Sequence, residues 1–153
     1  ETIDAIEKGA VEVDVVMNYA RFLSGEFDYV QDELARVAAA AHERGALLKV
    51  IFENHYLTGE QIAHACRIAE KAGDFVKTST GYAPSGSKIE DLKIMRASVS
   101  PHIMVKSAGG VKTLDQALAV LATGTVRIGT RSTKAILEEA AQREREGKLF
   151  VRF

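Results

Sequence analysis

Five short apolar runs alternate along the chain with longer stretches in which apolar residues recur every three or four positions. The runs are rich in Val, Ile, Leu and Phe, and they lack the regular apolar–polar alternation of a strand wetted on one face. This pattern predicts parallel strands that are covered on both faces. The predicted strands are Val11–Met17, Leu47–Phe52, Phe75–Thr78, Ile103–Lys106 and Val126–Gly129.

The longer stretches predict helices. Val30, Leu34, Val37 and Ala41 form one apolar stripe at helical spacing between the first two runs. We also expect a partial helix at the start of the chain and a charged helix near its end. These two helices are predicted at Glu1–Lys8 and Glu138–Lys148.

Residues typical of helix starts and helix ends lie at the boundaries of these stretches. Three pairs have the spacing of a capping box at an expected helix start. The pairs are Thr58 with Gln61, Ser87 with Glu90, and Thr113 with Gln116. Three glycines follow helical stretches, where a left-handed residue is favoured. They are Gly45, Gly73 and Gly124.

Repeated strand–helix alternation indicates an α/β fold with a parallel sheet and right-handed crossovers. No linker rich in Pro, Gly and Ser divides the chain, so we expect residues 1–153 to form a single domain. The hydrophobic content of 46% is sufficient for a packed core.

Composition excludes several classes of protein. A formal net charge of -1 gives no basic footprint for nucleic acid. No apolar run approaches the roughly 20 residues of a membrane-spanning helix, and we find no signal peptide. The single cysteine, Cys66, cannot form an internal disulfide, which favours a reducing compartment. We therefore expect a cytoplasmic protein with no membrane partner.

Charged residues interrupt four of the predicted strands at similar positions: Asp14, Lys49, Lys77 and Lys106. Burying an unpaired charge costs several kcal/mol, so such placement is unfavourable without a purpose. If the sheet closes into a barrel, one face points at the axis and these side chains converge toward the carboxyl ends of the strands, where barrel active sites lie.

Convergent lysines suit attack on a carbonyl group. A lysine attacks only as the neutral amine, and a nearby cation or an apolar wall favours that form. Lys106 beside Lys77 would supply the cation, and Asp14 could carry protons. The alternative interpretation is structural, with Asp14 and Glu53 forming buried salt bridges to two of the lysines.

Two glycine-containing turns follow the last two predicted strands. Gly109 and Gly110 come after the Lys106 strand, and Gly129 opens the turn that runs through Arg131 and Ser132 into a helix. In barrels, the corresponding loops often bind phosphate through backbone N–H groups and a helix N-terminus. We expect a phosphate site here, with Arg131 as a charged donor.

Several segments together resemble deoxyribose-phosphate aldolases, which are class I, Schiff-base aldolases. The most specific is Phe-Val-Lys-Thr-Ser-Thr-Gly at residues 75–81, and four others follow the family in order and spacing. These four are residues 12–16, 48–51, 105–111 and 127–129. The resemblance implies a TIM (β/α)₈ barrel that cleaves 2-deoxy-D-ribose 5-phosphate to acetaldehyde and D-glyceraldehyde 3-phosphate. It implies no metal and no organic cofactor.

The resemblance also assigns roles by motif position. Lys77 matches the lysine that forms the Schiff base, Lys106 the second lysine that perturbs it and transfers protons, and Asp14 the proton-relay aspartate. The remaining matches concern substrate and phosphate binding. Gly109, Gly110 and Ser132 fall at phosphate-binding positions, and Lys49 and Thr80 line the same cavity.

The chain is short for such a barrel, which typically has ~250 residues. We expect about the last five β/α units, with Glu1–Lys8 as part of the third helix and two open sheet edges. A longer polypeptide, a fragment, or a homo-oligomer whose partner chains complete the barrel would each account for this. Three other functions stay open: a different class I aldolase acting on a phosphorylated sugar or aldehyde, a non-catalytic partial barrel, and a phosphate-binding barrel without a Schiff base.

The remaining polar candidates are weaker. His55 lies near the carboxyl end of a predicted strand, and we interpret it as a loop histidine rather than a substrate contact. Cys66 shares a helical stripe with Ile62 and Ala69, which indicates core packing. The other histidines lack the spacing of metal ligands.

Overall fold

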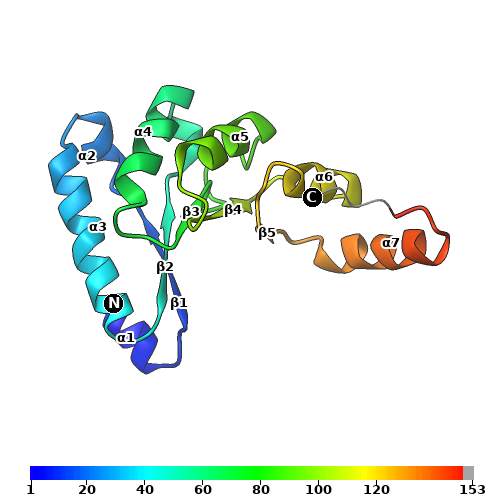
Figure 1. Cartoon of the computed structure of the whole chain (residues 1–153), viewed down its shortest axis with the longest axis horizontal. Coiled ribbons are helices and arrows are strands. Elements are labelled where there is room, and N and C mark those ends of the chain that lie inside the picture. Colours follow the sequence, from blue (N-terminus) through cyan, green and yellow to red (C-terminus); the bar gives the residue numbers. More distant parts are fainter. Residues whose placement is uncertain (150–153) are drawn as a thin grey trace.

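The computed structural model describes residues 1–149 and consists of alternating helices and strands (Figure 1). The strands begin and end close to the predicted positions. They are β1 (Glu12–Val16), β2 (Leu47–Ile51), β3 (Phe75–Lys77), β4 (Met104–Ala108) and β5 (Arg127–Gly129). The helices are α1 (Thr2–Glu7), α2 (Tyr19–Leu23), α3 (Phe27–His42), α4 (Gly59–Ala69), α5 (Ile89–Ser98), α6 (Leu114–Leu121) and α7 (Thr133–Arg145), with a 3₁₀ turn, η1, at Asn54–Tyr56.

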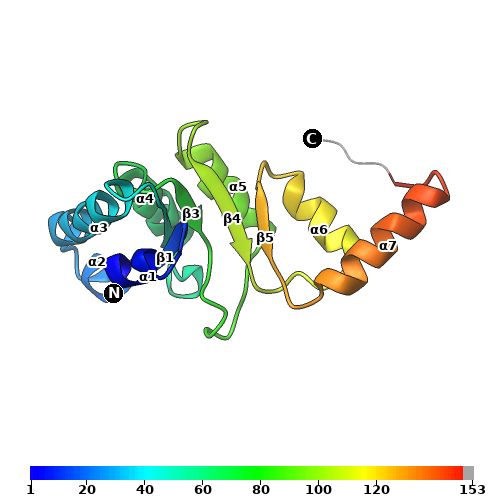
Figure 2. The ribbon, with the colours of Figure 1, turned by 90° about the horizontal axis from the view of Figure 1, so that it is seen from below.

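The strands form one parallel sheet in the order β1-β2-β3-β4-β5, as the sequence predicted. Consecutive strands are neighbours throughout, so β1 and β5 form the two edges within the described residues. Figure 2 shows α3, α4, α5 and α6 following one another along the same side of the row of strands. The fold is therefore a run of β/α units whose other face is open.

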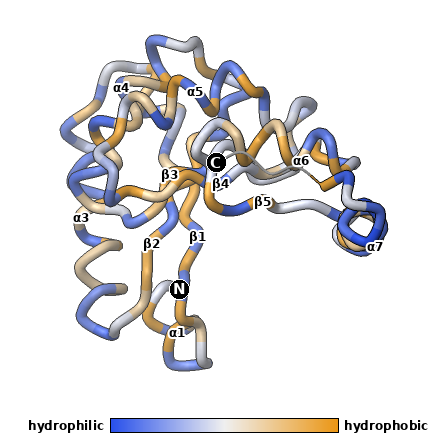
Figure 3. Tube along the Cα trace, turned by 45° about the vertical axis from the view of Figure 1, so that its right-hand side comes forward, coloured by the Kyte–Doolittle hydropathy of each residue, from blue (hydrophilic) through white to orange (hydrophobic). Residues whose placement is uncertain are grey.

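The hydrophobic core lies between the sheet and these helices. Side chains alternate along a strand, and the residues that point toward the helices are completely buried. They include Leu48, Val50, Val76 and Val105. Apolar stripes of α3, α4 and α5 pack against them, among them Leu34, Ile62 and Leu92. In Figure 3 the strands are mostly orange and α7 is mostly blue, in keeping with the single buried residue of that helix, Ile136.

Two of the three predicted capping boxes are confirmed. Thr58 and Thr113 accept hydrogen bonds from the backbone N–H three residues on, and the glutamine side chains bond back. The prediction for Ser87 is wrong, because α5 begins at Ile89 without a side-chain cap. The Ser87 N–H instead donates to the carbonyl of Gly109 at 3.2 Å, so a contact with the next loop replaces the local cap.

Two of the three glycines predicted to end helices are confirmed as left-handed residues, and one is not. Gly45 and Gly124 have φ of 71° and 84°, as expected for left-handed residues after a helix. Gly73 does not adopt positive φ, so that prediction is wrong. A Cβ on Gly73 would lie 2.9 Å from Cγ2 of Val50, so the glycine permits close helix–sheet packing instead.

Other differences concern helix bounds. The sequence pattern did not predict α2, whose start is capped by the Asn18 side chain. The charged helix α7 begins at Thr133, before the predicted Glu138, and ends at Arg145. Among residues 1–149, no helix has the length and apolar character needed to cross a membrane.

An ion pair joins the two edge strands across the open face. Arg127 of β5 donates to Glu12 of β1, and the Lys49 ammonium lies 3.0 Å from the same carboxylate oxygen. The Arg127 guanidinium also lies 4.8 Å from the ring centroid of Phe75, a cation–π distance. Hydrogen bonds from Arg127 and then Lys49 lower the pKa of Glu12 from 4.5 to about 2. A charged contact therefore holds the two edge strands toward each other on the open face of the sheet.

This pair predicts a specific acid sensitivity. A carboxyl group with a lowered folded-state pKa stabilises the fold above its unfolded pKa, and that contribution is lost as the pH falls. We expect the wild-type free energy of unfolding to decline between pH 4.5 and about 2, and Glu12→Gln to be less stable at neutral pH with a flatter decline. Urea unfolding of the wild type and of Glu12→Gln across this pH range measures the two free energies of unfolding. Glu144→Gln, on the exposed side of α7, is the control; parallel curves for wild type and Glu12→Gln would contradict the account.

Candidate active site

Three lysines from three successive strands meet one carboxylate on the open face of the sheet. The Lys49 ammonium lies 3.4 Å from Oδ1 of Asp14. The ammonium groups of Lys77 and Lys106 lie 3.4 Å and 3.5 Å from Oδ2. The strand register aligns Asp14 with Lys49, and Lys77 with Lys106. The predicted convergence of these four side chains is confirmed.

The lysines are more buried than the carboxylate that they share. Their side chains are 4%, 10% and 15% exposed in chain order, whereas that of Asp14 is 35% exposed. Lys49 is also paired with Glu12, so its charge is balanced from two sides. Lys77 and Lys106 share the remaining oxygen of Asp14 and therefore compete for one counter-charge.

This competition shifts the ionisation of the cluster. Burial and then the neighbouring Lys77 charge lower the pKa of Lys106, and these effects outweigh the attraction of Asp14. Burial alone would raise the pKa of Asp14, but the charges of Lys77, Lys106 and Lys49 outweigh it, so that pKa is lowered. The site thus holds an ionised carboxylate beside a lysine that gives up its proton more easily than usual.

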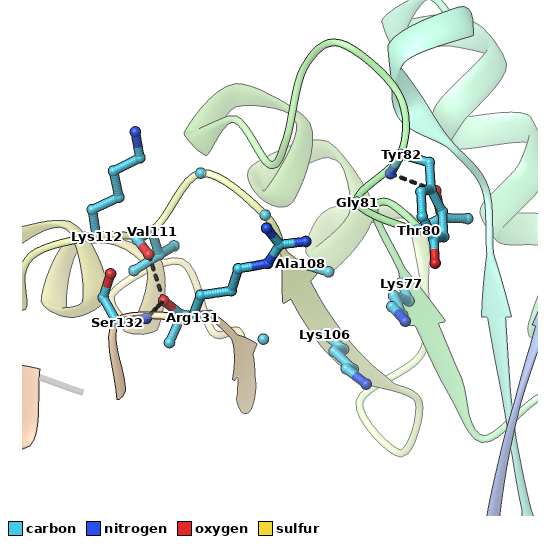
Figure 4. A pocket seen from close by; sticks show the side chains of 14 residues that line it. Lys77, Thr80, Gly81, Tyr82, Lys106, Ala108, Val111, Lys112, Arg131 and Ser132 are labelled. Carbon is cyan, nitrogen blue, oxygen red and sulfur yellow. Dashed lines mark hydrogen bonds between the residues drawn. The ribbon is translucent and has the colours of Figure 1, made fainter. Parts of the chain in front are cut away.

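A cavity of about 540 Å³ opens above this cluster, at the carboxyl ends of β3, β4 and β5 (Figure 4). This volume is within the usual range for small-molecule sites. Figure 4 shows Lys77 and Lys106 side by side below the loops that surround the cavity. Of the predicted site residues, Asp14 and Lys49 do not line it and lie beneath the two lysines. Those that do line it are Lys77, Thr80, Lys106, Gly109, Gly110, Gly129, Arg131 and Ser132.

The charge of the cavity lining is positive. Two further cations, Lys112 and Arg131, contribute to it, and no Asp or Glu is present among the described lining residues. In Figure 4 the Arg131 side chain extends toward Ala108, whereas Lys112 points away from Lys77 and Lys106. Within residues 1–149, the Arg131 guanidinium makes no ion pair, so its charge is available to an anion. Sequence reasoning did not select Lys112, although it closely follows the Gly-Gly turn.

Glycines bring two cavity loops into direct backbone contact. Gly109 and Gly110 have φ of 79° and 85°, a conformation that favours glycine. A Cβ on Gly86 would lie 2.6 Å from the carbonyl carbon of Gly109, so only glycine fits there. Nothing in the local sequence identified Gly86, because its partner is in another loop.

Not every predicted phosphate ligand has a free amide. The N–H of Gly109 donates to the carbonyl of Gly129 at 3.3 Å, and the N–H of Ser132 donates to the hydroxyl of Thr130 at 2.9 Å. In the described residues, the N–H groups of Gly110 and Arg131 have no such acceptor. Ser132 is the N-cap of α7, and its side chain makes no capping bond. Gly109 and Gly129 therefore shape the cavity, while Gly110, Arg131 and the Ser132 hydroxyl offer donors.

The partner of Glu53 is not the lysine that the alternative structural interpretation expected. Its carboxylate accepts hydrogen bonds from the backbone N–H and the hydroxyl of Thr80 instead. The left-handed backbone of Glu53 ends the strand alternation that placed it on the lysine face. The alternative interpretation is therefore wrong for Glu53, although the ion pairs it expected between Asp14 and lysines are present.

The other polar candidates lie outside the cavity. Nδ1 of His55 is 2.8 Å from the hydroxyl of Ser85, which fits a loop histidine. Burial raises the pKa of Cys66 to about 12, and its side chain lies in the core as predicted. Across residues 1–149, no group of three or more His, Cys, Asp or Glu side chains could hold a metal ion.

Comparison with known proteins gives consistent relatives. The family described as DeoC/LacD family aldolase matches residues 1–137. The deoxyribose-phosphate aldolase of Thermococcus gammatolerans is 46% identical over 145 residues, covering 94% of this chain and 64% of the relative. That of Clostridium novyi is 48% identical over 139 residues, covering 90% of this chain and 62% of the relative. The chain thus spans less than two thirds of the length of these relatives.

Solved structures agree on the fold. A structure titled "QR15, an Aldolase" superposes with a TM-score of 0.88 at 37% identity, covering 95% of this chain and 65% of that one. The tetrameric deoxyribose phosphate aldolase of Aeropyrum pernix gives 0.80 at 28% identity, covering 90% and 58%. The predicted α/β fold, as part of a TIM barrel, is confirmed. Because the family match spans most of the sequence, the chain belongs to the DeoC/LacD family of aldolases.

Proposed function

We propose that the protein cleaves 2-deoxy-D-ribose 5-phosphate to acetaldehyde and D-glyceraldehyde 3-phosphate through an imine on Lys77. The observation that carries this proposal is the pair Lys77 and Lys106 facing one carboxylate at the base of a cationic cavity. The names of the relatives support the substrate. The single buried cysteine fits a cytoplasmic enzyme.

The first step needs a neutral amine and a route for protons. Two ammonium groups that share one carboxylate repel each other, so one proton leaves more easily than from an isolated lysine. Neutral Lys77 attacks the C1 aldehyde of the open-chain sugar and forms a carbinolamine. Protonated Lys106, directly or with Asp14 relaying its proton, then protonates the departing hydroxyl, which leaves as water and gives the protonated imine.

The protonated imine then accepts the electrons of the C2–C3 bond. A base, Asp14 or neutral Lys106 acting directly or through one water, removes the proton of the C3 hydroxyl. The C2–C3 bond breaks, C3 becomes the aldehyde of glyceraldehyde 3-phosphate, and the electron pair forms an enamine between C1 and C2. Protonation of C2 and hydrolysis of the imine release acetaldehyde and regenerate Lys77.

The cavity mouth provides the phosphate site in this proposal. The N-terminus of α7, the free amides of Gly110 and Arg131, and the Arg131 guanidinium offer donors to an anion. Ser132 adds a hydroxyl at the N-terminus of α7. Lys49 acts from beneath, where it holds one oxygen of Asp14 in place.

Imine trapping tests the proposal. With deoxyribose 5-phosphate or acetaldehyde, borohydride should leave a covalent adduct that intact-mass spectrometry detects and peptide mapping places on Lys77. Lys77→Ala should abolish the adduct, and Lys106→Met should slow its formation because one proton carrier and one cation are lost. Lys112→Met, a cavity lysine distant from Asp14, is the control and should trap normally. An adduct that persists in Lys77→Ala, or that maps to Lys106, would contradict the assignment.

The phosphate site predicts a selective defect. Arg131→Ser should raise KM for deoxyribose 5-phosphate about tenfold, because it removes a charged hydrogen bond, and should leave kcat nearly unchanged. Cleavage of 2-deoxyribose, which has no phosphate, should be unaffected, and Arg131→Lys should keep part of the affinity. Steady-state kinetics with both sugars measures these changes. An equal loss of kcat/KM on the two sugars would exclude Arg131 as a phosphate ligand.

A further inference from the structure

Glu53 occupies an unfavourable backbone conformation beside the cavity. Among residues 1–149 it is the only non-glycine residue with positive φ, at 56° with ψ of 61°. The left-handed region is disfavoured for a residue with a Cβ, and glycine would adopt it freely. Strain of this kind persists where the surrounding structure holds it, and such residues cluster at functional sites.

The Glu53 side chain is also unusual. The residue is only 5% exposed, and no cation pairs with it among the described residues. Its carboxylate instead directs its hydrogen bonds to a single residue. The backbone N–H of Thr80 donates to it at 3.2 Å, and the Thr80 hydroxyl donates to its second oxygen. A buried carboxylate is costly, so these contacts must hold it in place.

These contacts fix the cavity wall that follows the Schiff-base strand. The Thr80 hydroxyl, which donates to Glu53, accepts a hydrogen bond from the N–H of Tyr82 at 3.1 Å. Thr80, Gly81 and Tyr82 all line the cavity, and Figure 4 shows this bond beside Lys77. Asn54, which follows Glu53 in the chain, donates its N–H to the carbonyl of Thr78 at 2.9 Å. The segment after β2 thus holds the segment after β3 at two successive points.

The hydrogen-bond direction has a chemical consequence for Thr80. A hydroxyl has one proton, and here it is committed to Glu53. Thr80 can therefore meet a ligand in the cavity only as an acceptor. A hydroxyl group on the substrate has the proton that this acceptor requires, whereas a two-carbon aldehyde has none.

We propose that Glu53 is a positioning residue that orients Thr80 to accept a hydrogen bond from a hydroxyl of the bound sugar. This inference rests on the proposed lyase function and deepens it. Glu53 does not touch the reacting atoms, and Thr80 contributes to recognition of the hydroxylated part of the substrate. Imine formation by a small aldehyde does not depend on this contact.

The experiment compares two substrates across a small set of variants of the full protein. Glu53→Gln and Thr80→Val should each raise KM for deoxyribose 5-phosphate about tenfold, the effect of losing one hydrogen bond between Thr80 and the sugar. Borohydride trapping with acetaldehyde should proceed at the wild-type rate in both. The double variant should be no worse than either single variant, because the two side chains act as one unit.

Glu53→Gly separates positioning from stability. It removes the carboxylate and the backbone strain together, so it should show the KM defect while unfolding at a urea concentration no lower than that of Glu53→Gln. A purely structural role for Glu53 would instead slow acetaldehyde trapping along with sugar cleavage, and would overturn the inference. Unchanged KM in Glu53→Gln with normal trapping overturns it as well. A wild-type protein that traps no imine overturns the lyase function, and this inference with it.

Discussion

The carboxylate of Asp14 is the interaction on which the site depends. It faces the ammonium groups of Lys49, Lys77 and Lys106 at 3.4–3.5 Å, and the lysine side chains are nearly buried. Three cations at such separations repel strongly where water is scarce, and one carboxylate offsets only part of that repulsion. The incomplete compensation favours loss of a proton from Lys106. Under the proposed function it supports formation of the neutral amine that carbonyl chemistry requires.

The sheet builds this arrangement in layers. Apolar side chains on one face pack against the helices, and the charged side chains of the same strands are forced onto the other face by alternation. Beside Lys49 and Lys106 on the same face, Glu12, Arg127 and Phe75 hold the two edge strands toward each other. Above them, loops joined by backbone contacts at Gly86 and Gly109 form the cavity mouth. The contact between the edge strands supports the curvature of the sheet. Under the proposed function, the lysines serve proton chemistry and the loops bind the anion.

Much of this arrangement could be predicted from local sequence. The apolar runs located all five strands, and the charges inside them identified Asp14, Lys49, Lys77 and Lys106. Features set by distant contacts could not be predicted. Ser87 donates its N–H to Gly109 while α5 begins two residues later, and the amide of Gly109 is itself used by Gly129. Glu53 turns to Thr80 because its backbone is left-handed, which no spacing rule reveals.

The most direct test of the shared carboxylate is an NMR titration of the lysine side-chain amines, assigned by single substitutions. The account predicts that Lys106 titrates below its ordinary pKa of 10.5, that Lys77→Met raises this value, and that Asp14→Asn lowers it further. These directions follow because Lys77 opposes the charge on Lys106 and Asp14 supports it. A Lys106 amine that titrates at its ordinary value, or that is insensitive to both substitutions, would contradict the account.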